Sequence, residues 1–139
     1  MNLTAIYRDE AGRWYECDDE EAAGKPVPEK QLGKLWETKI PIFWSAEESL
    51  LHLKKQKISL PKEAHCALTV CNLLKENSRV QFRGIGHASL YFFEEKVTDS
   101  GPALSNSILH LFCLEELKED GVLEEYNNQL QKIRQRVLN

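Results

Sequence analysis

The sequence predicts an α+β domain: a mainly antiparallel sheet with an N-terminal hairpin, and one central and one C-terminal helix packed on it. Three patterns carry this prediction: two β-prone segments separated by a turn, a capping signature before a leucine-rich stretch, and a late apolar stripe at helical spacing. With 139 residues, of which 42% are hydrophobic and 29% charged, the chain suffices for a single domain, residues 1–139, with its own core.

The hairpin is expected from the first seventeen residues. Residues 3–8 and 13–17 are β-prone, and the segment between them ends in Gly12, which favours a turn. Residues 18–34 then lose all periodicity and have the composition of a loop. Glycine and proline recur there at Gly24, Pro26, Pro28 and Gly33.

The central helix is expected to follow a strand at residues 35–44. Proline cannot donate a hydrogen bond to a ladder, so Pro41 places that strand at an edge or makes it irregular. Ser45 and Glu48 then have the spacing of a capping box, which predicts a helix that ends before Pro61.

The middle of the chain is predicted to be strand-rich. Residues 64–74, 79–83 and 87–93 are apolar, β-branched or alternating, which favours three strands, with a bulge at residues 84–86. Residues 108–114 form a short apolar run that fits a strand or the start of a helix, and the sequence leaves both open.

The last segment has the clearest periodicity. Its apolar residues fall on one side of a helix and its charges agree with the helix dipole, so we expect a C-terminal helix that packs on the sheet. The apolar stripe consists of Leu123, Tyr126, Leu130, Ile133 and Val137.

Composition narrows the function classes. A net charge of −4 argues against direct nucleic-acid binding, which needs clustered basic residues. The N-terminus has no signal-peptide pattern and no apolar run is long enough to cross a bilayer, so we expect a cytoplasmic protein that does not contact membranes. The cysteines, Cys17, Cys66, Cys71 and Cys113, are expected to be reduced.

No motif indicates catalysis. The histidines and cysteines lack the spacing of a zinc site, and no nucleophile-elbow signature occurs. We therefore expect no catalytic residue, no metal and no cofactor. The alternative is a small hydrolase or transferase that uses His65 or His87 with a cysteine or carboxylate, and a pocket holding two such groups would favour it.

An acidic run stands at the start of the predicted loop: Asp18, Asp19, Glu20 and Glu21. Such runs often only keep a loop solvated, and no calcium-loop spacing is present. The functional interpretation is a docking surface for a basic protein, because local negative potential speeds the encounter with a cationic partner. Trp14 and Trp36 border the run and are candidate anchors, since aromatic residues are common at interface hot spots.

Three segments, residues 40–44 (IPIFW), 67–70 (ALTV) and 90–97 (LYFFEEKV), look similar in order and character to immunity proteins of interbacterial toxin systems, including contact-dependent growth inhibition. The resemblance covers mainly the middle of the chain and transfers no individual site residue. It implies an immunity or antitoxin-like protein that binds a cognate toxin domain, often a nuclease, and covers its active site or substrate surface. A third hypothesis is an adaptor that homodimerises through the Pro41 edge or the C-terminal helix.

Overall fold

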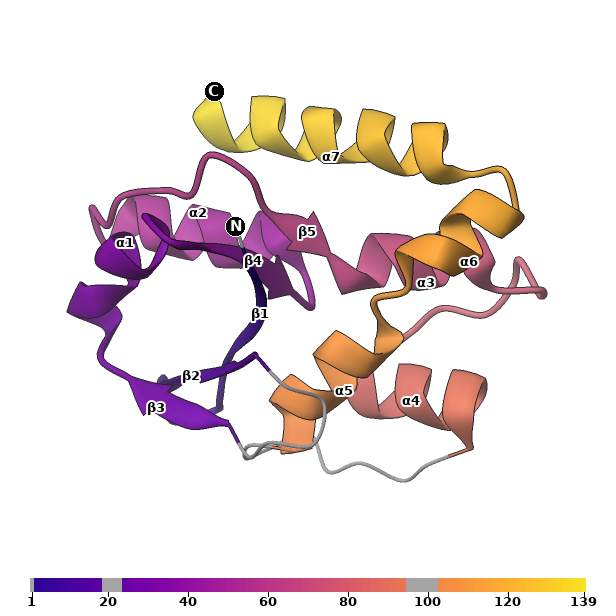
Figure 1. Cartoon of the computed structure of the whole chain (residues 1–139), viewed down its shortest axis with the longest axis horizontal. Helices are drawn as coiled ribbons and strands as arrows, with labels where there is room; N and C mark the ends of the chain where they lie inside the picture. Colours follow the sequence, from indigo (N-terminus) through magenta and orange to yellow (C-terminus); the bar gives the residue numbers. More distant parts are fainter. Residues whose placement is uncertain (1, 19–23, 95–102) are drawn as a thin grey trace.

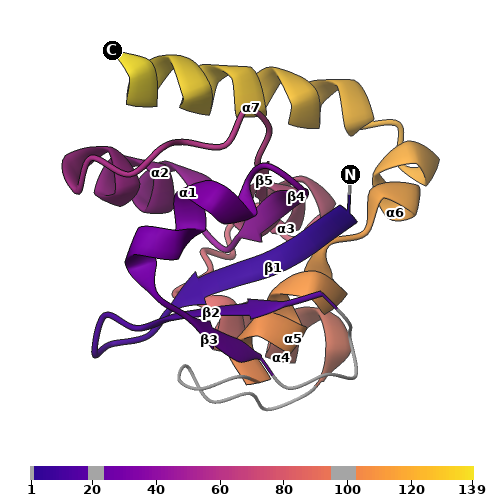
Figure 2. The ribbon, with the colours of Figure 1, turned by 60° about the vertical axis from the view of Figure 1, so that its left-hand side comes forward.

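A mixed sheet lies at the centre of the computed structural model, which describes residues 2–18, 24–94 and 103–139 (Figures 1 and 2). The five strands have the order β3-β2-β1-β4-β5. They are β1 Asn2–Arg8, β2 Trp14–Cys17, β3 Lys25–Val27, β4 Lys39–Phe43 and β5 His65–Cys66. β2 pairs antiparallel with both β1 and β3, whereas β4 runs parallel to both β1 and β5. The expectation of a mainly antiparallel sheet is therefore wrong.

The predicted N-terminal hairpin is confirmed. β1 and β2 pair with Ala5 opposite Cys17 and Arg8 opposite Trp14. In the turn, the Asp9 amide donates to the Arg13 carbonyl at 2.9 Å, and the Arg13 amide donates to Asp9 Oδ1 at 2.8 Å. Gly12 has a φ of 84°, a left-handed conformation that glycine adopts without strain.

β4 is an inner strand, so the expected edge position of Pro41 is wrong. The ladder between β4 and β5 contains only Ile42 and Phe43 on the β4 side. Pro41 precedes that ladder and lies opposite Thr4 in the ladder between β1 and β4. The same finding removes the Pro41 edge as a surface for homodimerisation.

The helices are α1 Leu32–Leu35, α2 Ala46–Lys55, α3 Ala67–Leu74, α4 Ile85–Phe93, α5 Ala103–Leu111, α6 Leu114–Glu119 and α7 Leu123–Leu138, together with the 3-10 turn Glu29–Gln31. The expectation of only one central and one C-terminal helix is therefore wrong. So is the expectation of a purely irregular segment at residues 18–34, because that segment contains β3, the 3-10 turn and the start of α1.

The predicted strands in the middle of the chain are mostly helical. Of residues 64–74, only His65 and Cys66 form a strand, and α3 follows at once. Residues 79–83 have no regular structure, and residues 87–93 belong to α4. Gly84 is the residue before that helix rather than part of a bulge. For residues 108–114 the sequence left strand and helix open; residues 108–111 are helical and end α5.

α2 begins after Ser45, as predicted, although no side-chain capping bond forms there. It ends well before Pro61. The Lys57 amide donates to the Lys54 carbonyl at 3.1 Å, and the Ile58 amide donates to the Leu53 carbonyl at 3.0 Å. These bonds close the helix in a Schellman motif, which requires the left-handed φ of 60° seen at Lys57.

Helices cover both faces of the sheet. α5 contacts β1, β2 and β4 on one face, and α4 packs against α5. α2 packs on β4 at the other face. Along β1 the side chains alternate accordingly: Ala5 and Tyr7 belong to the core cluster with α4 and α5, whereas Ile6 belongs to the cluster with α2.

The predicted C-terminal helix is confirmed as α7, but its packing partners differ from the expected sheet. It packs against α2, α3 and α6, as Figure 1 shows along the upper edge of the molecule. Tyr126, Ile133 and Val137 of its apolar stripe are buried.

Within the part of the chain that the structure describes, no helix has both the length and the apolar character needed to cross a bilayer.

Candidate functional site

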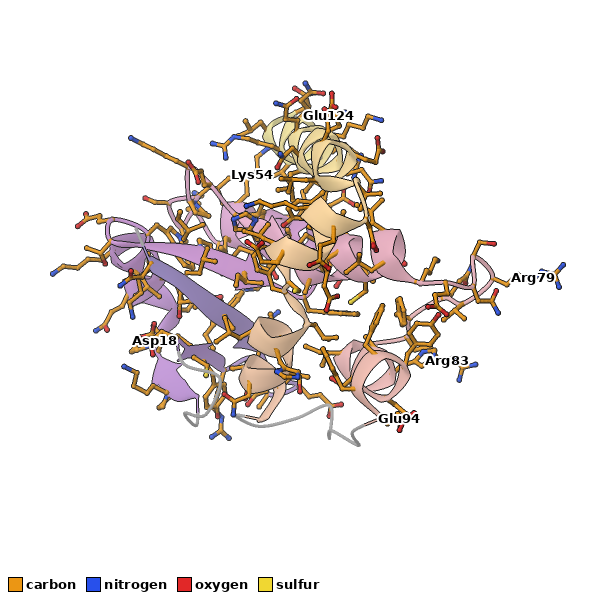
Figure 3. All side chains as sticks on the ribbon, turned by 45° about the vertical axis from the view of Figure 1, so that its right-hand side comes forward. Asp18, Lys54, Arg79, Arg83, Glu94 and Glu124 are labelled. Carbon is orange, nitrogen blue, oxygen red and sulfur yellow. The ribbon has the colours of Figure 1, made fainter. Side chains whose placement is uncertain are left out.

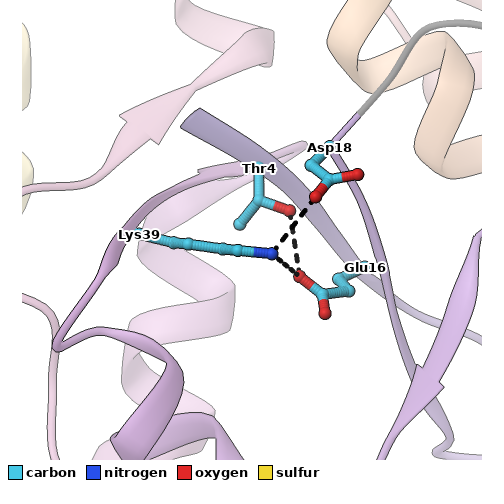
Figure 4. A network of polar contacts seen from close by, with 4 residues as sticks. All are labelled: Thr4, Glu16, Asp18 and Lys39. Atoms are coloured by element: carbon cyan, nitrogen blue, oxygen red, sulfur yellow. Dashed lines mark hydrogen bonds and ion pairs between the residues drawn. The ribbon is translucent and has the colours of Figure 1, made fainter. Parts of the chain in front are cut away.

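Asp18 is the one member of the acidic run that the structure describes, since Asp19, Glu20 and Glu21 lie outside the described residues. Lys39 Nζ donates to Asp18 Oδ2 at 3.3 Å and to Glu16 Oε2 at 3.0 Å (Figure 4). The Thr4 hydroxyl also donates to Glu16, at 3.3 Å. The hydrogen bond and the charge of Lys39 lower the pKa of Asp18. The charge of Asp18 is thus partly balanced within the chain.

The two tryptophans proposed as anchors are core residues. Trp14 is 2% exposed and donates from Nε1 to Glu29 Oε1 at 3.1 Å. Trp36 is 7% exposed and donates from Nε1 to the Ser59 carbonyl at 3.0 Å. Both rings are therefore part of the core of this chain, and their role as interface anchors stays a prediction.

His65 and His87 do not come together. His65 Nδ1 lies 2.8 Å from the Tyr126 hydroxyl, which also accepts the Cys66 amide at 3.2 Å. Burial lowers the pKa of the His65 imidazole. His87 is on α4 and accepts the Arg83 amide at Nδ1, at 3.2 Å.

The cavity beside His65 lies between α2, α7 and the segment before β5. Glu63 lines it as well, whereas neither His87 nor a cysteine does. Burial raises the pKa of the Cys71 thiol to about 12, which keeps it protonated and weakly nucleophilic. Among the described residues, which include all four cysteines, there is neither a disulfide nor a group of three side chains placed to share a metal ion.

A groove of about 580 Å³ between α4, α6 and the segment after α3 gathers acidic side chains. Its lining residues are Leu74, Glu76, Tyr91, Phe92, Glu116, Glu119 and Asp120, and we call it the acidic groove. Glu76 follows α3, the two aromatic residues are on α4, and the other carboxylates lie on α6 or at its end.

The carboxylates of the acidic groove have no cationic partner among the described residues. The lysines adjacent to them in sequence have other partners: Lys118 pairs with Glu115 at 3.5 Å, and Lys75 Nζ donates to the Val80 carbonyl at 2.8 Å. Glu119 and Asp120 stand at the C-terminal end of α6, where the backbone carbonyls already carry partial negative charge. The groove therefore has a negative potential that nothing in its own wall neutralises.

Aromatic rings form one wall of the acidic groove. Tyr91 and Phe92 are in edge-to-face contact, with 4.8 Å between ring centroids. The Tyr91 hydroxyl accepts the Glu76 amide at 3.1 Å, which joins α4 to the segment after α3. An arginine side chain could meet both a ring face and a carboxylate here, the two groups that guanidinium prefers.

Sequence reasoning missed this groove because its parts are far apart in the chain. The acidic residues of α6 are visible in the sequence, but residues 87–93 were expected to be a strand, which would not place Tyr91 and Phe92 beside α6. Helical spacing of Ile85, Ala88 and Ser89 is the signal that could have indicated α4.

Comparisons of this chain with protein-family models, curated proteins and solved structures found no match. The function is therefore inferred from the chain's own residues.

Proposed function

We propose that this protein is an immunity-type protein, which binds a basic toxin domain and neutralises it by covering its active site or substrate surface. The observation that carries the proposal is the acidic groove: four carboxylates without a cationic partner among the described residues, next to two aromatic rings. The protein acts by binding, in the cytoplasm, and needs no cofactor.

The groove favours a partner that itself acts on a polyanion. A nuclease carries basic side chains that contact the phosphate backbone. Carboxylates spread over a concave surface present a similar pattern of negative charge, and they attract the same basic side chains. A protein held in this way would lose access to its nucleic acid.

The enzyme alternative has less support. It required a cysteine or carboxylate within hydrogen-bonding reach of His65 or His87 in a pocket. Glu63 shares a cavity with His65, but the hydrogen bond of His65 is to Tyr126, and that of His87 is to the Arg83 amide. The N-terminal acidic run stays a prediction, with Asp18 held by Lys39. Homodimerisation through α7 stays a prediction as well.

The proposal is tested by co-expression with the product of an adjacent reading frame that encodes a small basic domain. The variant E76Q/E116Q/E119Q/D120N removes the groove's charge while keeping side-chain size. The matched control E10Q/E37Q/E63Q/E124Q removes the same charge from exposed residues outside the groove.

We expect the native protein and the control to restore growth and to bind the toxin domain. We expect the groove variant to associate with the toxin domain at least about tenfold more slowly. If the native protein neither binds the domain nor relieves its toxicity, the proposed function is wrong. If the groove variant protects as well as the control, the groove is not the docking surface.

A further inference from the structure

A second cavity, of about 440 Å³, lies at the carboxyl ends of the parallel strands β1 and β4. We call it the strand-end crevice. Arg8 ends β1 on one side of it, Trp44 and Ser45 follow β4, and Gly84 and Ile85 at the start of α4 contribute another wall. Small ligands bind preferentially at this end of parallel strands, where loops and helix starts converge.

Two guanidinium groups stand at this crevice. Arg8 and Arg83 both line it and both are exposed. The Arg83 side chain forms no hydrogen bond or ion pair with the described residues. Figure 3 shows Arg83 on the segment that leads into α4, away from Asp18. Two arginines that line one cavity are typical of sites for phosphate or carboxylate groups.

A hydrogen-bonded relay holds Arg8 at the crevice. His52 Nε2 lies 2.7 Å from Glu29 Oε1, and this contact is the main cause of the lowered pKa of Glu29. Trp14 Nε1 donates to the same oxygen at 3.1 Å. The other imidazole nitrogen, His52 Nδ1, lies 3.5 Å from Arg8 Nη1. Because Arg8 can only donate, His52 accepts at Nδ1 and carries its proton on Nε2, toward Glu29.

Two further features of the crevice bear on anion binding, with opposite signs. Gly84, the residue before α4, lines the cavity and supplies no side-chain cap, so the positive end of that helix lies at the cavity. Asp9 and Glu48 also line the crevice. Asp9 accepts the Arg13 amide and keeps its negative charge, and Glu48 is exposed, so both carboxylates oppose an anion.

We propose that the strand-end crevice binds a small molecule through an oxyanion, phosphate or carboxylate, with Arg8 and Arg83 as the contacting cations. The cavity and the two guanidinium groups carry this inference. It is independent of the acidic groove, which is lined by none of the same residues.

The test is an NMR titration of the full chain with inorganic phosphate and, separately, with succinate. Saturable amide shifts are expected at Ser45 and at Gly84 and Ile85. R83Q should weaken binding about tenfold, since it removes a charge-assisted contact without breaking a bond of the fold. E48Q should strengthen binding, because it removes an opposing charge. R79Q, at an exposed arginine that does not line the crevice, is the matched control and should leave binding unchanged.

R8Q should also weaken binding, with its urea unfolding midpoint measured to show that the fold is kept. Saturation by phosphate alone or by succinate alone would support the proposal and identify the ligand class. The proposal is overturned if neither anion shifts the crevice amides, or if R79Q weakens binding as much as R83Q does.

Discussion

Tyr126 connects two elements of the fold through one hydroxyl. It is fully buried on α7, accepts the Cys66 amide and is hydrogen-bonded to His65 Nδ1. Its ring is stacked on His65, with 5.9 Å between ring centroids. The hydroxyl therefore ties α7 to the edge strand β5, which is only two residues long.

Y126F should lower the free energy of unfolding by about 1–3 kcal/mol, because it leaves the buried Cys66 amide without an acceptor. Urea denaturation followed by circular dichroism measures this. Y91F is the matched control: its hydroxyl accepts the Glu76 amide in an exposed segment, where water can replace it, so the loss should be about 0.5 kcal/mol. Equal losses in the two variants would contradict the structural role of Tyr126.

His65 makes stability depend on pH. Burial lowers its pKa below the ordinary value of 6.5, although the charge of Glu63 opposes the shift in part. Above 6.5 the imidazole is neutral in both states. As the pH falls below 6.5, the unfolded chain binds a proton that the folded chain does not, so stability decreases until the folded pKa is passed.

The measurement is the urea unfolding free energy between neutral pH and about pH 5. H65Q should flatten part of the decrease, whereas H87Q, at an exposed histidine, should leave it unchanged. The same slope in the native protein and in H65Q would show that His65 does not contribute.

At the scale of single elements, the turn that ends α2 has a lysine where the backbone conformation favours glycine. Lys57 is left-handed, with a φ of 60°, at the residue where a Schellman motif usually has glycine. K57G should therefore raise the free energy of unfolding by about 1 kcal/mol. Q131G, in the exposed middle of α7, should lower it by about 1 kcal/mol. A loss of stability in K57G would contradict the left-handed conformation.

The elements predicted correctly have local causes. The hairpin depends on the turn at Asp9 to Gly12, and the starts of α2 and α7 depend on residues within one or two helical turns. The α3 and α4 segments were predicted to be strands because Thr69, Val70 and a run of aromatic residues favour strands locally. They form helices whose buried residues contact α5, α6 and α7. Tertiary packing overrides a weak local preference in short apolar segments.

The sequence could predict a candidate site only where all of its residues come from one segment of the chain. Lys39, which neutralises Asp18, comes from another strand, and the burial of Trp14 and Trp36 depends on α2 and α7. None of these contacts has a signal in sequence spacing. The acidic groove likewise combines residues from α3 to α6, so it becomes visible only when the helices are assembled.

At the scale of the whole molecule, two cavities with opposite charge patterns lie on different elements. The acidic groove belongs to α4 and α6, and the strand-end crevice belongs to the sheet and α2. α4 contributes to both, with its start at the crevice and its C-terminal end at the groove. We expect binding of the toxin domain to weaken with added salt, because association is driven by unpaired carboxylates.

The most direct test of the central claim is the association rate of the toxin domain with the native protein, the groove variant E76Q/E116Q/E119Q/D120N and the control E10Q/E37Q/E63Q/E124Q, each at low and high salt. The account predicts a rate that falls steeply with salt for the native protein and the control, and a slow, nearly salt-independent rate for the groove variant. A groove variant with the native rate and the native salt dependence would contradict it.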